Sequence, residues 1–301
     1  MQVVEVNNIT KSFGKVHAVD GISFSVESGE ILGLIGPNGA GKTTTIRMLL
    51  DIFKSDSGSV AVLGGPMDES KKDRIGYLPE ERGLYQDISL EKCLTYLASI
   101  KGMPAALIEE RLADYLRRFD LTEYRKRKVK DLSKGMQQKA QIITTFIHQP
   151  QLVIVDEPFS ALDPVNTQMV KDLMRAEKAR GTAIIMSTHQ MNQAEELCDR
   201  ILLVNKGRIM LSGPIQEIRR QFARPEILVK SSAPLPQDIP GISRVESENQ
   251  HLRAYLEPGA SPQAVLNEMV RRGVSLDQFE VAQPTLDEIF IQVVTGGGTQ
   301  A

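Results

Sequence analysis

Hydrophobic residues in the first two-thirds of the chain gather in short runs that end in polar residues. The runs are GEILGLIG (29–36), QLVIVDEP (151–158) and TAIIMSTH (182–189). Strands that are buried on both faces of a parallel sheet have this nearly continuous apolar character. The pattern therefore predicts an α/β domain, and RILLVNKGRIMLSG (200–213) predicts a hairpin that turns at residues 205–207.

Residues 90–147 follow a helical period instead. One apolar face carries Leu90, Cys93, Leu94, Leu97 and Ile100, and another carries Ile108, Leu112, Tyr115, Leu116 and Phe119. This spacing predicts a helical insertion, at about residues 85–147, within the α/β domain.

The composition changes after residue 222, where the proline-containing sequences ARPE (223–226) and SSAPLPQDIPG (231–241) occur. Three short strands, a helix over 262–272, a strand near 279–282 and a last helix over 286–294 follow in the pattern. We therefore predict a first domain over residues 1–222, a small α+β domain over 223–296 and a flexible tail over 297–301.

Three glycines in six positions separate the first buried run from a helical pattern over Lys42–Phe53. Gly36, Gly41, Lys42 and Thr43 fit the phosphate-loop pattern G-x-x-x-x-G-K-[ST]. In such a loop the backbone N–H groups face an anion, the lysine reaches the β- and γ-phosphates, and the hydroxyl ligates Mg²⁺. The alternative is a plain glycine turn before a helix.

Two adjacent carboxylates, Asp156 and Glu157, end the second buried run. An aspartate at this position can hold Mg²⁺, and the glutamate beside it can polarise an attacking water molecule. The alternative reading of the pair is a helix-capping role.

Charge and cysteine content narrow the class of protein. The chain has 36 basic and 38 acidic residues. Its net charge of −2 gives no overall attraction to nucleic acid or to an anionic membrane. The run RKRKVK (125–130) is interpreted as a solvated or nucleotide-attracting face, and we expect no nucleic-acid partner. Two cysteines, Cys93 and Cys198, both within helical patterns, indicate reduced core thiols in a cytosolic protein. With no signal peptide and no run of eighteen apolar residues, we expect a chain that is neither exported nor membrane-spanning.

Five motifs occur in the order and at the approximate separations found in the ATP-binding subunits of ABC transporters, a family that the chain resembles over residues 1 to about 222. They are GPNGAGKT, LSKGMQQK (132–139), VIVDEP (153–158), SALD (160–163) and STHQ (187–190). The sequence PTLDEIF (284–290) resembles the end of an appendage in subunits that serve ABC-2-type exporters. The resemblance implies an α/β fold, a P-loop NTPase ABC ATPase core with an antiparallel β subdomain and a helical insertion, plus a small C-terminal α+β domain.

The resemblance also implies site residues for ATP and Mg²⁺. ATP would be bound by Phe13 and by the loop residues Gly36, Pro37, Asn38, Gly39, Ala40, Gly41, Lys42, Thr43 and Thr44, and from the opposite protomer by Ser133, Lys134, Gly135, Met136 and Asp163. Thr43, Asp156 and Glu80 would ligate Mg²⁺, and Glu157, His189 and Lys42 would carry catalysis.

Several of these residues have alternative local roles. Phe13 can be a core side chain, Ser133 a helix cap and Asp163 a turn former, and a lone histidine after a strand is often structural. The chain also departs from the family pattern: Lys134 and Met136 replace the usual glycine and glutamine, and Glu80 replaces a glutamine. Because these changes leave the backbone cradle intact, ATPase activity is still expected.

The function implied by the resemblance is ATP hydrolysis that powers transport, with export favoured, through a separate membrane permease. Two copies would close head to tail over two ATP molecules at the cytoplasmic face of the cell membrane. The alternatives are a soluble ABC ATPase that remodels a macromolecular complex and a non-catalytic regulatory module. A single phosphate loop without an inserted coiled coil disfavours the first, and the intact Lys42, Asp156 and Glu157 disfavour the second.

Overall fold

The computed structural model describes residues 1–81, 83–231, 235–236, 238–248 and 251–295. They divide into two compact units, Met1–Ile215 and Gln216–Ala301. This division falls at the start of helix α8 (Ile215–Phe222), whereas the boundary predicted from the sequence, residue 222, falls at its end. The predicted tail, 297–301, lies outside the described residues.

The N-terminal unit is built on a six-stranded sheet in the order β5-β6-β7-β3-β8-β9. The strands are β3 (Ile31–Ile35), β5 (Ile75–Leu78), β6 (Leu152–Asp156), β7 (Ala183–Thr188), β8 (Arg200–Asn205) and β9 (Arg208–Pro214). All pairs are parallel except β8 with β9, which form the predicted hairpin. Every residue of β3, β6 and β7 is buried, which explains their continuous apolar sequence.

A second, antiparallel sheet has the order β2-β1-β4. Its strands are β1 (Gln2–Phe13), β2 (Val16–Glu27) and β4 (Ser57–Val62). One hydrophobic core joins the two sheets, with Ile22 from the antiparallel sheet and Ile154 from the parallel one. Helix α1 (Lys42–Leu49) adds Ile46 and Leu49 to this core, so packing against both sheets fixes the helix that follows the phosphate loop.

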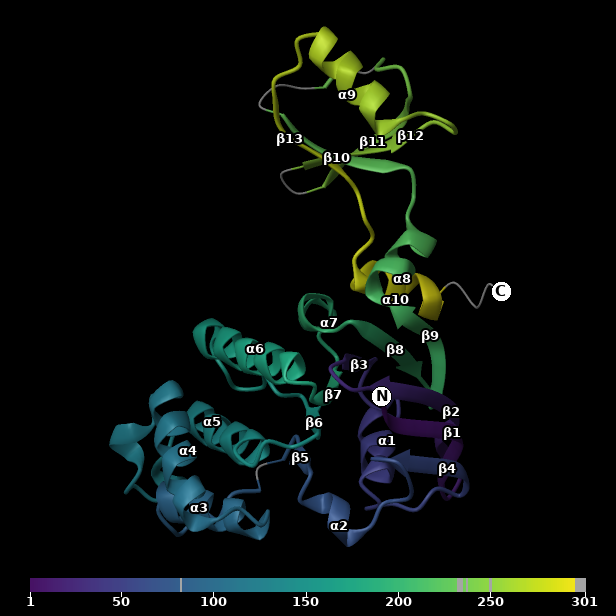
Figure 1. The fold of residues 1–301 in the computed structure, drawn as a ribbon. Coiled ribbons are helices and arrows are strands. Elements are labelled where there is room, and N and C mark those ends of the chain that lie inside the picture. The colour runs from purple at the N-terminus through teal and green to yellow at the C-terminus, as the bar shows by residue number, and fades with distance from the viewer. Residues whose placement is uncertain (82, 232–234, 237, 249–250, 296–301) are drawn as a thin grey trace. The chain divides into compact units, whose positions relative to one another are not determined.

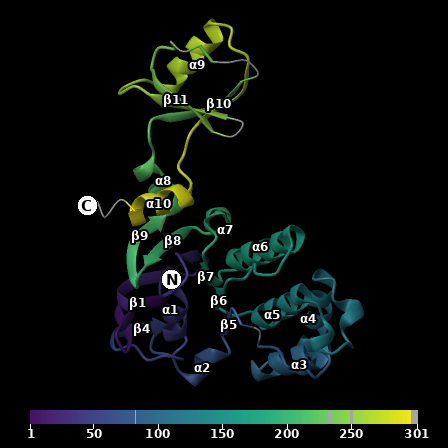
Figure 2. The same cartoon turned by 180° about the vertical axis from the view of Figure 1, so that it is seen from behind.

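The remaining helices of the N-terminal unit surround the parallel sheet or form the insertion. They are α2 (Glu69–Lys72), α3 (Leu90–Ile100), α4 (Ala105–Arg118), α5 (Lys134–Phe146), α6 (Pro164–Ala179) and α7 (Met191–Leu197), with 3₁₀ turns at Thr122–Tyr124 and Val129–Asp131. Helices α3, α4 and α5 pack together on the side of the unit away from the antiparallel sheet (Figures 1 and 2). The predicted helical insertion is therefore present. Within the described residues, no helix combines the length and apolar character needed to cross a membrane.

Two sequence predictions of helix extent are wrong. The helix predicted over Lys42–Phe53 ends at Leu49, because Asp51 adopts a left-handed φ of 59° that stops the helical hydrogen-bond pattern. Cys198 lies just after α7 in an extended conformation rather than within a helix. Its burial is as predicted, and burial raises the pKa of both the Cys93 and the Cys198 thiols.

The C-terminal unit is a four-stranded antiparallel sheet in the order β11-β12-β10-β13 with two further helices. Its elements are β10 (Glu226–Ser231), β11 (Ile242–Glu248), β12 (His251–Leu256), α9 (Pro262–Arg271), β13 (Leu276–Val281) and α10 (Leu286–Thr295). A separate core contains Ile227 and Val229 of β10 together with Val265 and Met269 of α9. The predicted α+β character is confirmed.

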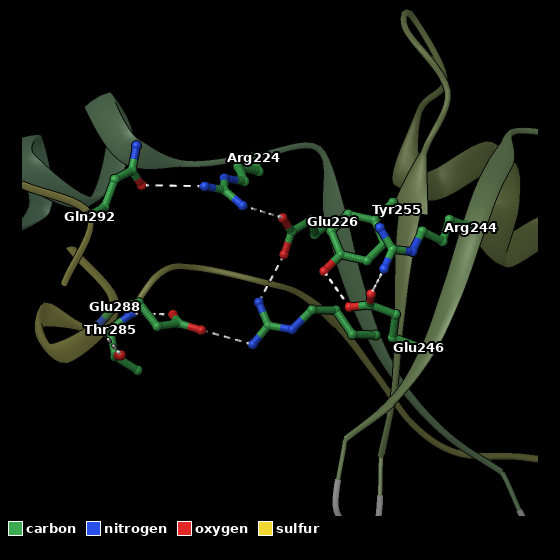
Figure 3. A network of polar contacts seen from close by, with 9 residues as sticks. Arg224, Glu226, Arg244, Glu246, Tyr255, Thr285, Glu288 and Gln292 are labelled. Carbon is green, nitrogen blue, oxygen red and sulfur yellow. Dashed lines mark hydrogen bonds and ion pairs between the residues drawn. The ribbon is translucent and has the colours of Figure 1, made fainter. Parts of the chain in front are cut away.

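The sequence PTLDEIF forms the start of α10. Thr285 Oγ1 accepts a hydrogen bond from the Glu288 N–H at 3.2 Å, and the Glu288 carboxylate accepts from the Thr285 N–H at 2.9 Å. This reciprocal pair is a capping box. Glu288 also accepts from Arg253 of β12, which binds Glu226 of β10 at 2.8 Å (Figure 3). The motif thus fixes where α10 begins and connects the helix to the sheet of its own unit.

The burial of both thiols predicts that they resist modification in the folded protein. Cys93 is fully buried and Cys198 is 9% exposed, and a raised pKa keeps them protonated and unreactive. Reaction with a thiol-specific disulfide reagent should be slow in buffer and should reach both thiols in urea. As a control, Val165→Cys places a thiol at a position that is 75% exposed and should react at once. Immediate reaction of the unmodified chain in buffer would contradict this packing.

Candidate functional site

The phosphate loop needs glycine because its backbone packs tightly against neighbouring strands. A Cβ at Gly36, where φ is 150°, would lie 2.1 Å from the Val204 carbonyl oxygen of β8. A Cβ at Gly41, where φ is 108°, would lie 2.3 Å from the Ala18 carbonyl oxygen of β2. No side chain fits at either position. Both positions in the loop between β3 and α1 therefore require glycine, a tighter constraint than a plain glycine turn before a helix needs.

A cavity of about 580 Å³ opens beside this loop. Its walls are Val16, His17, Ala18, Asn38, Gly39, Ala40, Gly41, Lys42, Thr43, Thr44, Glu80, Asp156, Glu157 and Lys206. The cavity brings together most of the phosphate-loop residues and all three carboxylates that the sequence analysis assigned to metal binding or catalysis. Gly36 and Pro37 form the start of the loop without lining the cavity.

Lys42 is the cation at the bottom of the loop. It is 7% exposed, and its Nζ donates to the carbonyl oxygens of Gly36 at 2.8 Å and Pro37 at 3.1 Å. Burial lowers its pKa, while Glu157, Asp156 and Glu80 act in the opposite direction. A buried ammonium group beside a ring of backbone N–H donors suits an anionic ligand such as a phosphate chain.

Asp156 links three segments at the end of β6. It is 2% exposed, and its two carboxylate oxygens accept hydrogen bonds from Thr43 Oγ1 at 2.9 Å and from Ser187 Oγ at 2.5 Å. Ser187 was not assigned a role from the sequence, although it lies in the STHQ motif. Because β6 and β7 are parallel neighbours, their carboxyl ends bring Asp156 and Ser187 to the same edge of the sheet.

The oxygen atoms of this cluster fit Mg²⁺ bound together with a nucleotide. Mg²⁺ prefers oxygen ligands, and proteins commonly hold it with one or two carboxylates plus substrate phosphates. Thr43 and Asp156 supply such oxygens side by side, and Glu80 lines the same cavity. Among the described residues, no group of three histidine, cysteine, aspartate or glutamate side chains could hold a metal ion unaided. The arrangement therefore suits an ion that needs phosphate oxygens to complete its ligands.

Glu157 is held in a defined orientation next to Asp156. Its Oε1 accepts hydrogen bonds from the His189 N–H at 2.9 Å and makes a 2.7 Å contact with His189 Nδ1, while Oε2 accepts from Thr188 Oγ1 at 3.2 Å. Its φ of 51° is a left-handed value that is uncommon for a residue other than glycine. Strain of this kind persists where the surroundings determine the conformation, often at functional sites. His189 contacts Glu157 but does not line the cavity.

Phe13 lies outside the cavity lining. Its ring is 46% exposed and packs edge-on against Phe53, with 5.5 Å between the ring centroids. Part of the cavity wall is formed by Val16, His17 and Lys206, which the sequence analysis did not predict. These residues belong to no motif, and they reach the cavity only through the pairing of distant strands.

The signature residues and Asp163 also lie apart from the phosphate-loop cavity. Ser133 caps α5, where its Oγ accepts from the Met136 N–H at 3.2 Å. Asp163 caps α6, where it accepts from the Asn166 N–H at 2.9 Å, and the hydrogen bonds from Asn166 lower its pKa. Neither Asp163 nor any residue of 133–136 lines the cavity. In a single chain Ser133 therefore has the helix-cap role that the sequence analysis kept as its alternative, and Asp163 is also a helix cap rather than the turn former considered there.

Comparisons with known proteins agree with this geometry. Residues 19–160 match the family described as ABC transporter, and residues 213–294 match the family described as ATP-binding protein DrrA1-3-like, C-terminal domain. The chain is 37% identical over 294 residues to the uncharacterized ABC transporter ATP-binding protein YhaQ of Bacillus subtilis (strain 168), covering 97% of this chain and 98% of the relative. It is 31% identical over 298 residues to the Nod factor export ATP-binding protein I of Rhizobium sp. (strain N33), covering 96% of each.

A solved structure gives the same answer for the fold. The ATP binding subunit of an ABC transporter superposes with a TM-score of 0.70 at 34% identity, covering 73% of this chain and 93% of that one. With a phosphate loop, a buried aspartate and a held glutamate around one cavity, the chain belongs to the ATP-binding proteins of ABC transporters, a family that binds and hydrolyses ATP.

Proposed function

We propose that this chain powers export through a separate membrane permease by hydrolysing ATP in the cavity beside Lys42. The observation that carries the proposal is the position of Asp156, which accepts hydrogen bonds from the phosphate-loop residue Thr43 while its neighbour Glu157 is held by His189. A phosphate cradle, oxygen ligands for a metal ion and a candidate general base thus meet in one place.

Each of these residues has a part in the proposed hydrolysis. Glu157 orients and deprotonates the attacking water, with His189 holding the carboxylate and contacting the γ-phosphate. Lys42 stabilises the negative charge that develops on the transferred phosphoryl group. Thr43, Asp156 and Glu80 would hold Mg²⁺, which neutralises phosphate charge when bound. Phe13, exposed on β1, would stack on the adenine ring.

We further propose that two copies close over two ATP molecules. Ser133 and Lys134 are exposed at the N-terminal turn of α5, where N–H groups and the helix dipole favour an anion. Because residues 133–136 and Asp163 do not line the cavity of their own chain, a second copy would supply them to the γ-phosphate. Closure would depend on contacts that ADP lacks, so hydrolysis would reopen the dimer.

The proposed permease contact is the exposed apolar surface around residues 83–85 and α3. Tyr85 is 50% exposed, Tyr96 49% and Ile100 53%, and the rings of Tyr85 and Tyr96 meet edge-on at 5.5 Å. Apolar groups exposed together are typical of protein interfaces. A relative named for Nod factor export supports the direction of transport. The chain would then act at the cytoplasmic face of the cell membrane, with residues 223–296 as an accessory domain.

Replacing the proposed base tests the catalytic assignment. Glu157→Gln should lower ATP turnover by about 100-fold or more, because the water loses its general base. ATP binding should remain, and size-exclusion chromatography with ATP and Mg²⁺ should show a stable dimer. As a control, Asp172→Asn removes an exposed carboxylate on α6 and should leave turnover unchanged. Full activity of Glu157→Gln would remove Glu157 from the mechanism.

A charge in the apolar surface tests the permease contact. Tyr85→Asp should reduce co-purification with the membrane permease by roughly tenfold, because a carboxylate would be buried without a partner. ATPase activity of the isolated chain should persist. Met210→Asp is the matched control. Met210 is 41% exposed and lies on β9, the edge strand opposite β5, after which Tyr85 follows in the chain. Equal permease recovery with both variants would argue against docking at Tyr85.

A further inference from the structure

A second cavity of the N-terminal unit has the charge of an anion-binding site. It is an open pocket of about 400 Å³ lined by Arg111, Asp114, Tyr115, Arg117, Arg118, Gln149, Glu177 and Arg180. Its walls come from α4, from the connection between α5 and β6, and from the end of α6. None of these residues lines the phosphate-loop cavity.

Positive charge is in excess here, with four guanidinium groups against two carboxylates. Two of the arginines have carboxylate partners: Arg180 contacts Glu177 at 2.9 Å and Arg117 contacts Asp114 at 3.1 Å. Within each pair, the arginine and the carboxylate neutralise each other. The two pairs account for both carboxylates of the cavity. The remaining cations, Arg111 and Arg118, leave a net positive charge in the cavity.

The two remaining arginines are positioned for a ligand. Arg111 donates to the neutral acceptors Ile147 O at 3.0 Å and Gln149 Oε1 at 2.6 Å, which fix its side chain without neutralising it. Arg118 forms no hydrogen bond or ion pair with any residue in the part of the chain that the structure describes. The two lie seven residues apart on α4 and share the face that lines the cavity. Like charges held together in this way favour a bound anion.

The buried carboxylate Glu177 does not explain the whole cluster. Its side chain is 3% exposed and has Arg180 as a direct partner. Burial raises its pKa, although Arg180, Arg118 and Arg111 all act to lower it. The two arginines on α4 thus act on Glu177 only from a distance, which leaves for a ligand the donors of Arg118 and the N–H groups of Arg111 that do not bond Ile147 and Gln149.

We propose that this cavity binds a small phosphate-bearing molecule through Arg111 and Arg118, with Arg180 adding the N–H groups other than the Nη1 that contacts Glu177. The planar guanidinium fork matches phosphate oxygens, and several such groups around one anion give strong charge-assisted hydrogen bonds. The Tyr115 ring supplies an apolar wall for an organic portion of the ligand. A volume of about 400 Å³ lies within the usual range of small-molecule sites.

The position of the cavity gives the ligand a structural consequence. Helix α4 belongs to the helical insertion, whereas α6 packs on the parallel sheet and is capped at its start by Asp163. One phosphate held by arginines of both helices links the insertion to the sheet. Binding therefore stabilises the folded protein against unfolding.

The test uses inorganic phosphate as the probe on the full chain, with ADP and Mg²⁺ filling the phosphate-loop cavity. Side-chain NMR of the arginine Nε–H groups follows the titration at constant ionic strength. The resonances of Arg111, Arg118 and Arg180 should shift with saturation, while Arg175, on α6 but outside the cavity, should not. Arg118→Ala should weaken binding at least about fivefold, and Arg175→Ala should leave the affinity unchanged.

A linear, unsaturable shift, or equal affinity for wild type and Arg118→Ala, would overturn the proposal. Arg180→Ala provides a second variant on the other wall of the cavity, in case Arg118→Ala fails to fold, and circular dichroism checks the fold of each. The outcome is independent of ATP hydrolysis, because no cavity residue belongs to the proposed catalytic set.

Discussion

The carboxylate of Asp156 holds the site together. Its two oxygens accept hydrogen bonds from Thr43 of α1 and Ser187 of β7, and Asp156 itself ends β6. One buried side chain thus joins three segments, the start of α1, which lies 113 residues from Asp156 in the chain, the end of β6, and the end of β7, which lies 31 residues from Asp156. This is possible because β3, β6 and β7 are neighbouring parallel strands whose carboxyl ends share an edge. The continuous burial of these strands is thus what positions the chemistry.

In the proposed dimer, each chain contributes two complementary halves of two composite sites. One half is the cavity with Lys42 and the carboxylates, and the other is the exposed N-terminal turn of α5 with Ser133 as its cap. Helix capping and γ-phosphate binding both require Ser133 to lie at the N-terminal turn of a helix, where N–H groups face solvent. The capping observed in one chain is therefore compatible with the proposed role in a dimer.

Much of this arrangement could be predicted from sequence because it depends on local rules. Buried strands are recognisable as apolar runs in the sequence. The spacing of Gly36, Gly41, Lys42 and Thr43 predicts a phosphate-binding loop. Features that depend on tertiary pairing could not be predicted. Lys206 and His17 reach the cavity through strand pairings that no local sequence pattern indicates, and Arg111 and Arg118 on α4 have the pattern of an ordinary solvated helix face. The early end of α1 arises from one left-handed residue, Asp51.

The structure of the Glu157→Gln protein with ATP and Mg²⁺ tests the proposed two-chain site most directly. We expect a dimer in which Ser133 Oγ of each copy lies within hydrogen-bond distance of the γ-phosphate bound by Lys42 of the other. A nucleotide bound elsewhere, or a Ser133 remote from the γ-phosphate in every assembly, including the assembly with the permease, would contradict this expectation.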